Sequence, residues 1–166
     1  MHTSIIKAES VSKLVSTNQE QLTILEEVSL DILEGQSVAI VGTSGAGKST
    51  LMTLLAGLDV PTKGEIHLLG KPLSTLDDEA RAAIRSESVG FVFQSFLLIP
   101  SLTALQNVTL PCLLKGEKED TARAKELLES VGLKKRIDHL PSQLSGGEQQ
   151  RVALARAFMI KPKILF

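Results

Sequence analysis

Aromatic rings, cysteines and long apolar runs are scarce or missing in this 166-residue sequence. It has no tryptophan, no tyrosine and five phenylalanines, so few residues could stack on a flat ligand such as a nucleotide base. The single cysteine, Cys112, excludes an internal disulfide, which favours a reducing compartment and a role for Cys112 as a small core residue. No apolar run is long enough for a membrane span, and the stretch MHTSIIKAES lacks the apolar centre of a signal peptide. We therefore expect a cytosolic chain that can still dock on a membrane partner.

Strong charge of either sign is also missing, because the formal net charge is −1 and no long basic run occurs. The composition therefore gives no sign of a nucleic-acid partner. Hydrophobic residues make up 43% and charged residues 22%, which is typical of a globular protein. The length suits one domain that buries a core of its own.

The pattern of apolar residues predicts alternating strands and helices. Two antiparallel strands are expected at 4–15 and 22–33, and a strand buried on both faces is expected at 36–42. Further strands are expected at 64–70, 88–94 and after Pro162; helices are expected at 48–56, 76–87, 103–133 (broken by Pro111) and 146–159. This order predicts an α/β fold whose core is a mostly parallel sheet flanked by helices, with an N-terminal antiparallel β part and a helical insertion.

The stretch GTSGAGKST matches the pattern G-x-x-x-x-G-K-[ST] between a predicted strand and a predicted helix. Its glycines let backbone N–H groups point at phosphate oxygens, and the helix N-terminus adds positive charge. Lys48 supplies a charge to the β- and γ-phosphates, and the Ser49 hydroxyl is placed to bind Mg²⁺. A glycine-rich turn with a solvated lysine is the plainer alternative. We predict a P-loop NTPase core whose ATP-binding residues are Gly42, Thr43, Ser44, Gly45, Ala46, Gly47, Lys48, Ser49 and Thr50.

A second glycine motif, LSGGEQ, precedes the last predicted helix. Ser145 and Glu148 have the spacing of a capping box, which by itself explains a helix start. Gly146 and Gly147 are then in the first helical turn, where each costs up to about 1 kcal/mol relative to alanine. Because a simple cap does not need them, they indicate a second place where a phosphate can approach bare N–H groups. Both interpretations remain open on the residues alone.

Taken with the P-loop upstream, LSGGEQ followed by QRVALARA resembles the signature motif of ABC-type ATPases. Gln94 in GFVFQSF is similar to the glutamine of that family's Q-loop, although a polar residue at a strand end needs no such role. The stretch VGFVFQSFLLIPSLTALQNVTLP is similar to the subgroup that serves lipoprotein release and macrolide export. The motif order covers essentially the whole chain.

The resemblance implies a head-to-tail homodimer with ATP between the P-loop of one subunit and the signature residues of the other. The signature residues are Ser145, Gly146, Gly147, Glu148 and Gln149. Gln94 would position Mg²⁺ or the attacking water, with Ser49 and Gln94 as metal contacts. The segment from about Ser95 to Asn107 would touch a transmembrane permease subunit, which would bring the chain to the inner face of the cell membrane. The single domain 1–166 would divide into a core at 1–94 and 160–166 and a part at about 95–159 with the Q-loop, helical subdomain and signature helix.

Two departures from the family pattern affect the expected chemistry. Many members stack adenine on an aromatic residue near the end of the first strand, where this chain has about Val15, so base selectivity should be loose. The run KILF resembles the start of the family's Walker B strand, and the chain ends before the Asp–Glu pair that would follow. We therefore expect a C-terminally truncated family member, in which Gln94 is present but the general base is not.

Two functions remain open on the sequence. The first is the ATP-binding subunit of an ABC transporter for export or lipoprotein release, which would be an ATPase when intact. The second is a truncated module that binds ATP without hydrolysing it. The related DNA-repair proteins are excluded because residues 95–144 hold no sustained heptad repeat, and GTPases are excluded because no N-K-x-D motif occurs.

Overall fold

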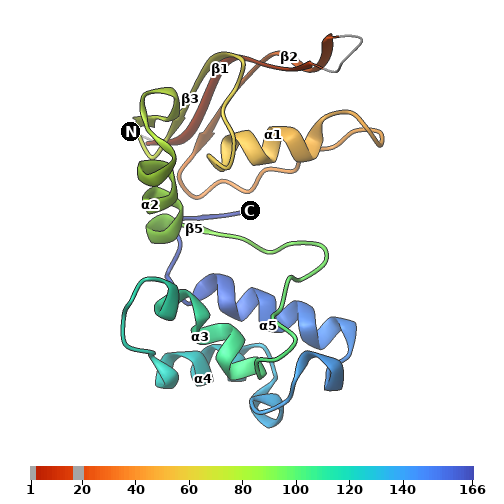
Figure 1. The fold of residues 1–166 in the computed structure, drawn as a ribbon, viewed down its shortest axis with the longest axis vertical. Helices are drawn as coiled ribbons and strands as arrows, with labels where there is room; N and C mark the ends of the chain where they lie inside the picture. Colours follow the sequence, from red (N-terminus) through yellow and green to blue (C-terminus); the bar gives the residue numbers. More distant parts are fainter. Residues whose placement is uncertain (1–2, 17–20) are drawn as a thin grey trace. The chain divides into compact units, whose positions relative to one another are not determined.

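The computed structural model describes residues 3–16 and 21–166, which form two compact units, Met1–Ala83 and Ile84–Phe166. The first unit contains a four-stranded sheet in the order β2-β1-β3-β4 (Figure 1). Its strands are β1 (Ser4–Ser16), β2 (Gln21–Leu33), β3 (Lys63–Leu68) and β4 (Lys71–Pro72), and neighbouring strands are antiparallel. The predicted N-terminal antiparallel pair is therefore confirmed.

Helix α1 (Lys48–Leu55) packs against β2 and β3 of this sheet. Leu51, Leu54 and Leu55 of α1 are buried, and so are Ile66 and Leu68 of β3. An isolated helix of eight residues is marginal in water, so this packing is what holds α1 in place. The start of α1 at Lys48 agrees with the prediction from the glycine motif.

Residues 36–42 differ from the prediction of a buried strand. Within the described ranges they belong to no strand, and Val38 and Val41 are 56% and 86% exposed. An apolar run becomes a buried strand only where neighbouring strands pair with it, and the sequence pattern does not show whether they do.

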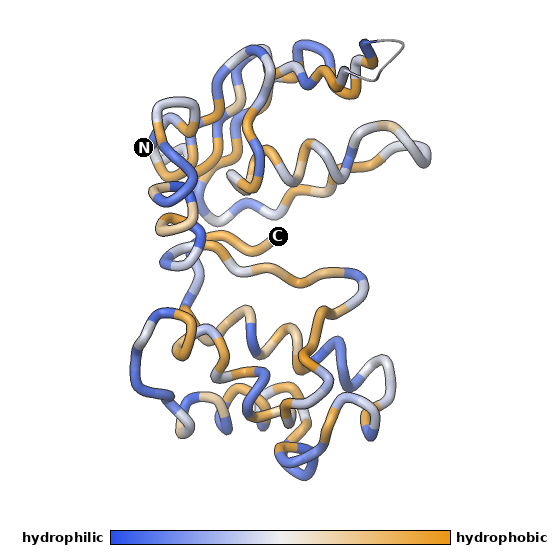
Figure 2. Tube along the Cα trace, viewed as in Figure 1, coloured by the Kyte–Doolittle hydropathy of each residue, from blue (hydrophilic) through white to orange (hydrophobic). Residues whose placement is uncertain are grey.

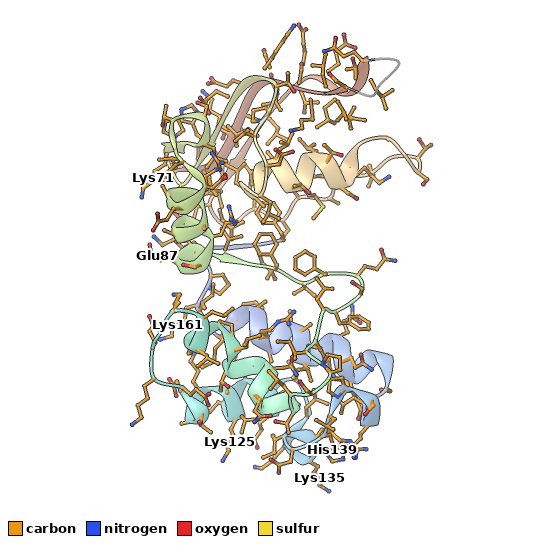
Figure 3. The ribbon with its side chains drawn as sticks, in the orientation of Figure 1. Lys71, Glu87, Lys125, Lys135, His139 and Lys161 are labelled. Atoms are coloured by element: carbon orange, nitrogen blue, oxygen red, sulfur yellow. The ribbon has the colours of Figure 1, made fainter. Side chains whose placement is uncertain are left out.

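The second unit is mainly helical, and its three longer helices pack on one another (Figure 1). They are α3 (Ala104–Leu114), α4 (Thr121–Ser130) and α5 (Gly146–Phe158). Their shared core contains Ala104, Val108, Cys112, Ala124, Leu128, Leu133, Leu144, Val152, Ala155 and Met159, which confirms Cys112 as a core residue. The predicted break at Pro111 is wrong, because Pro111 lies inside α3 and the helix continues to Leu114. Figure 3 shows Lys125 and Lys135 extending outward from this unit.

Strand β5 (Val89–Gly90) pairs in parallel with β6 (Ile164–Leu165) in the second unit. The Val92 N–H donates to the Phe166 carbonyl at 2.9 Å and continues the pairing, and the Phe91 ring stacks between those of Phe93 and Phe166. The last three residues, 164–166, are hydrophobic (Figure 2). The last predicted strand is thus paired with the strand that leads to Gln94.

The remaining described elements are helix α2 and the 3₁₀ turns. Helix α2 (Asp78–Ser88) begins where the Asp77 carboxylate accepts a hydrogen bond from the Ala80 N–H at 2.8 Å. The 3₁₀ turns are η1 (Leu73–Thr75), η2 (Lys134–Arg136) and η3 (Pro141–Gln143). No helix in the described ranges is long and apolar enough to cross a membrane.

Candidate functional site

The loop from Gly42 to Gly47 turns tightly before α1. Gly45 and Gly47 have φ values of 82° and 77°, a region that glycine adopts at little cost. A Cβ at Gly47 would lie 2.8 Å from the Ile24 carbonyl oxygen and 2.8 Å from a Leu25 methyl group. Gly47 therefore allows the loop to lie directly against β2, and any other residue there would move the loop.

The N-terminus of α1 has no side-chain cap and no acidic residue in its first turn. Lys48 folds back over the loop, where its Nζ donates to the carbonyls of Gly42 at 2.9 Å and Thr43 at 2.6 Å. An ammonium group has three donors, and these two acceptors belong to the exposed loop itself. Uncapped helix amides beside a lysine form a site for an anion such as a phosphate.

Ser49 is exposed on the first turn of α1, so its hydroxyl can contact a ligand at the loop. The described residues contain no cluster of three His, Cys, Asp or Glu side chains that could hold a metal alone. Mg²⁺ is commonly bound by only one or two protein ligands together with substrate phosphates. The donors present here fit Mg²⁺ that arrives with a phosphate, and Ser49 would be its contact.

Val15 lies near the end of β1 and pairs with Leu22 of β2. These side chains are 43% and 56% exposed, so they offer an aliphatic surface in the unit that also carries the loop. Leu25, further along β2, lies against Gly47, which places this strand pair beside the loop. The arrangement fits the expected aliphatic contact for a nucleotide base.

At the second glycine motif, Ser145 caps α5 with a complete capping box. Its hydroxyl accepts from the Glu148 N–H at 3.3 Å, and the Ser145 N–H donates to the Glu148 carboxylate at 2.8 Å. These bonds, with Arg136 at 3.1 Å, hold the pKa of the Glu148 carboxyl below its ordinary value. Because that pKa is lowered in the folded state, the cap's contribution to stability is present at neutral pH and is lost as the pH falls through it.

Gly146 and Gly147 begin α5, and packing within the chain does not require them. A Cβ at Gly146 would meet no atom within 4 Å, and one at Gly147 would meet only the Arg151 guanidinium at 3.8 Å. The helix thus carries two unfavourable residues whose open side could receive a ligand. Gln149 differs, since its amide donates to the carbonyls of Pro141 and Leu144 and so holds the turn before the helix.

Gln94 is exposed in a turn just after β5. Its side chain makes no hydrogen bond within residues 3–16 and 21–166, so it is available to a ligand. The P-loop lies in the first compact unit, whereas Gln94 and the signature residues lie in the second. The three motifs are therefore divided between the two units, with the P-loop in the first and the other two in the second.

Sequence reasoning missed Asn107, although it organises the segment after Gln94. Its side chain is fully buried and accepts from the Ile99 N–H at 2.8 Å. Its amide donates to the carbonyls of Ile99, Leu102 and Thr103 at 3.2, 3.0 and 3.1 Å. Asn107 thus fixes the end of the segment that was expected to touch a membrane partner, and its own side chain cannot reach that partner.

We expect Asn107→Ala to lower the free energy of unfolding by about 1–3 kcal/mol, because the Ile99 N–H and the Leu102 carbonyl lose their part-buried hydrogen bonds to the Asn107 side chain. Denaturant unfolding measures the change. Gln106→Ala, at the exposed neighbouring position, loses only a capping contact and serves as the control. A smaller loss for Asn107→Ala than for the control would contradict this role.

Comparisons with known proteins agree with the family that the motifs indicate. The family model described as ABC transporter matches residues 25–166. An uncharacterized ABC transporter ATP-binding protein of Escherichia coli (strain K12), YbbA, is 55% identical over 165 residues, which cover 98% of this chain and 72% of YbbA. LolD, the lipoprotein-releasing system ATP-binding protein of Xanthomonas oryzae pv. oryzae (strain MAFF 311018), is 49% identical over 96% of this chain and 66% of its own length.

Solved structures agree with these relatives. The dimeric ATP-binding cassette MJ0796 in a post-hydrolysis state, bound to ADP and Pi, matches with a TM-score of 0.88 and 43% identity. The match covers 96% of this chain and 72% of that one. The predicted fold class and the predicted resemblance are both confirmed.

Proposed function

The chain belongs to the ABC transporter family as an ATP-binding subunit with LolD-type relatives, and we propose that it binds MgATP at residues 42–50 to drive a membrane partner. The observation that carries this proposal is the uncapped N-terminus of α1, with Lys48 folded over the glycine loop. Only an anionic ligand gains from all of these donors at once.

The residues of the loop have distinct roles in this proposal. The N–H groups of residues 43–50 contact the phosphates, while Lys48 exchanges its loop carbonyls for β- and γ-phosphate oxygens. The Ser49 hydroxyl binds Mg²⁺, which neutralises charge on the phosphates when bound. The exposed Gln94 reaches the same metal or the attacking water, and the base rests on the aliphatic surface at Val15.

The second glycine motif, residues 145–147, forms a second phosphate-binding cradle in addition to that of the P-loop. It serves the nucleotide of another subunit. Ser145, Gly146 and Gly147 present a helix end with open space beside it, and the solved relative MJ0796 is dimeric. A homodimer that holds ATP between the two motifs explains why one chain carries two cradles. Glu148 and Gln149 support the cradle from within their own chain, by the cap and the preceding turn.

The exposed apolar side chains after Gln94 are proposed to contact a transmembrane permease subunit. Leu97 and Ile99 are 55% and 37% exposed on a segment fixed at its far end by Asn107. This contact would place the chain at the inner face of the cell membrane. The transported substrate is of the lipoprotein-release or export type by analogy with LolD, and no observation favours a binding-only module over this function.

Saturating MgATP, at about 100 times its Kd, should stabilise the chain by about 2.7 kcal/mol and raise its melting temperature by roughly 5–10 °C. Adenosine should have little effect, because the phosphates carry the binding. MgGTP should bind within roughly tenfold of MgATP, because aromatic stacking, worth about 0.5–1.5 kcal/mol, is missing at Val15. Thermal unfolding with each ligand measures both effects, and an adenosine shift equal to that of MgATP would disprove the phosphate site.

A further inference from the structure

The two residues that follow Ser95 have an unusual backbone. Phe96 and Leu97 have φ values of 60° and 47°, the left-handed region that bulky residues rarely adopt. The Phe96 N–H donates to the Phe93 carbonyl at 2.9 Å, and the Leu97 N–H donates to the Ser95 carbonyl at 2.6 Å. Such strain persists only where surrounding contacts hold it.

Arg156 of α5 supplies those contacts. Its Nη2 donates to the Phe96 carbonyl at 2.8 Å and its Nη1 donates to the Leu97 carbonyl at 2.7 Å. One planar guanidinium therefore spans the two strained residues, a geometry that a lysine cannot reproduce. Within the described ranges Arg156 forms no ion pair with a carboxylate, and burial lowers its pKa without removing its charge at neutral pH.

The position of Arg156 on α5 links two motifs. The helix begins at the Ser145 cap, and Arg156 lies in its last turn, roughly 16 Å along the axis. Val152 and Ala155 pack the middle of α5 into the helical core. A movement of the Ser145 end is thus carried by a packed helix to the backbone just after Gln94.

We propose that Arg156 is a positioning residue through which α5 sets the conformation of the turn that carries Gln94. The proposal rests on the proposed function for the roles of Gln94 and Ser145, but the contact itself is independent of nucleotide. Engagement of the second cradle by a partner's nucleotide would shift α5, and Arg156 would transmit that shift to Gln94.

The test is hydrogen–deuterium exchange without nucleotide, comparing Arg156→Lys with the unaltered chain. Arg123→Lys is the matched control, because Arg123 also spans two consecutive carbonyls, those of Phe158 and Met159, at 2.8 and 3.1 Å. We expect Arg156→Lys to speed exchange at the Phe96 and Leu97 amides roughly tenfold or more, and Arg123→Lys to leave them unchanged.

A second substitution separates positioning from general stability. Leu97→Gly relieves the strain at one of the two left-handed residues, so adding Arg156→Lys to it should change exchange of the Phe96 amide less than in the parent chain. Parent-like exchange in Arg156→Lys, or equal acceleration in Arg123→Lys, would overturn the proposal. MgATP should raise the melting temperature of Arg156→Lys as it does that of the parent chain. If MgATP raised neither melting temperature, that result would count against the proposed function alone.

Discussion

Lys48→Ala should weaken MgATP binding roughly 10- to 100-fold, as measured by titration calorimetry. The lysine is the one side-chain charge in the P-loop motif, and a hydrogen bond to a charged group contributes about 1.5–3 kcal/mol. Its two present partners, the Gly42 and Thr43 carbonyls, show that Nζ already lies over the loop. The substitution therefore removes a group that is in place before the ligand arrives.

Folding should be little affected by this substitution, so the loss of affinity can be assigned to the ligand. The contacts that Lys48 makes now are exposed, and exposed polar contacts contribute little to stability. Lys63→Ala, on the exposed part of β3, removes the same charge from the same unit and is the control. Equal affinities of the Lys48→Ala and Lys63→Ala chains would show that the loop is a glycine-rich turn and not a nucleotide site.

Ser145→Arg should abolish ATP-dependent dimers while leaving MgATP binding by the monomer within about threefold of the parent. Ser145 lies beside the open N–H groups of Gly146 and Gly147, and the first cradle is in another unit. A long cationic side chain there blocks the approach of a second subunit but not the loading of the P-loop. Light scattering with and without MgATP reports the dimer.

Loss of the cap itself needs its own control, because removing an N-cap costs about 0.5–2 kcal/mol. Thr103→Arg removes the other serine- or threonine-capped box, at α3, where Thr103 and Gln106 are reciprocally bonded. We expect this variant to keep the ATP-dependent dimer. If both variants lost it, or if Ser145→Arg lost monomer binding, Ser145 would be only a helix cap.

Sequence alone predicted the features that depend on neighbouring residues. Ser145 and Glu148 are three residues apart, so their capping box could be predicted and is confirmed. The start of α1 follows from the glycine motif in the same way. Residues 36–42 failed as a strand because pairing depends on distant partners, which the apolar pattern does not contain.

Arg156 and Asn107 could not be found by the same reasoning, because both bond to backbone carbonyls. Every residue offers a carbonyl, so no residue type in the sequence identifies the acceptor. The partners of Arg156 are also 59 and 60 positions away along the chain. Only the folded unit brings them together, which is why two residues that shape the segment after Gln94 went unpredicted.

The starts of α1 and α5 differ in whether side chains already bond to their backbone N–H groups. No side chain occupies the amides at the start of α1, so a nucleotide loads there without displacing a cap. At α5 the Ser145 hydroxyl and the Glu148 carboxylate already bond to each other's backbone N–H groups, which leaves the Gly146 and Gly147 amides to a phosphate. On the proposed function, a nucleotide therefore binds first at the uncapped amides of α1, and the capped start of a second subunit's α5 contacts it afterwards.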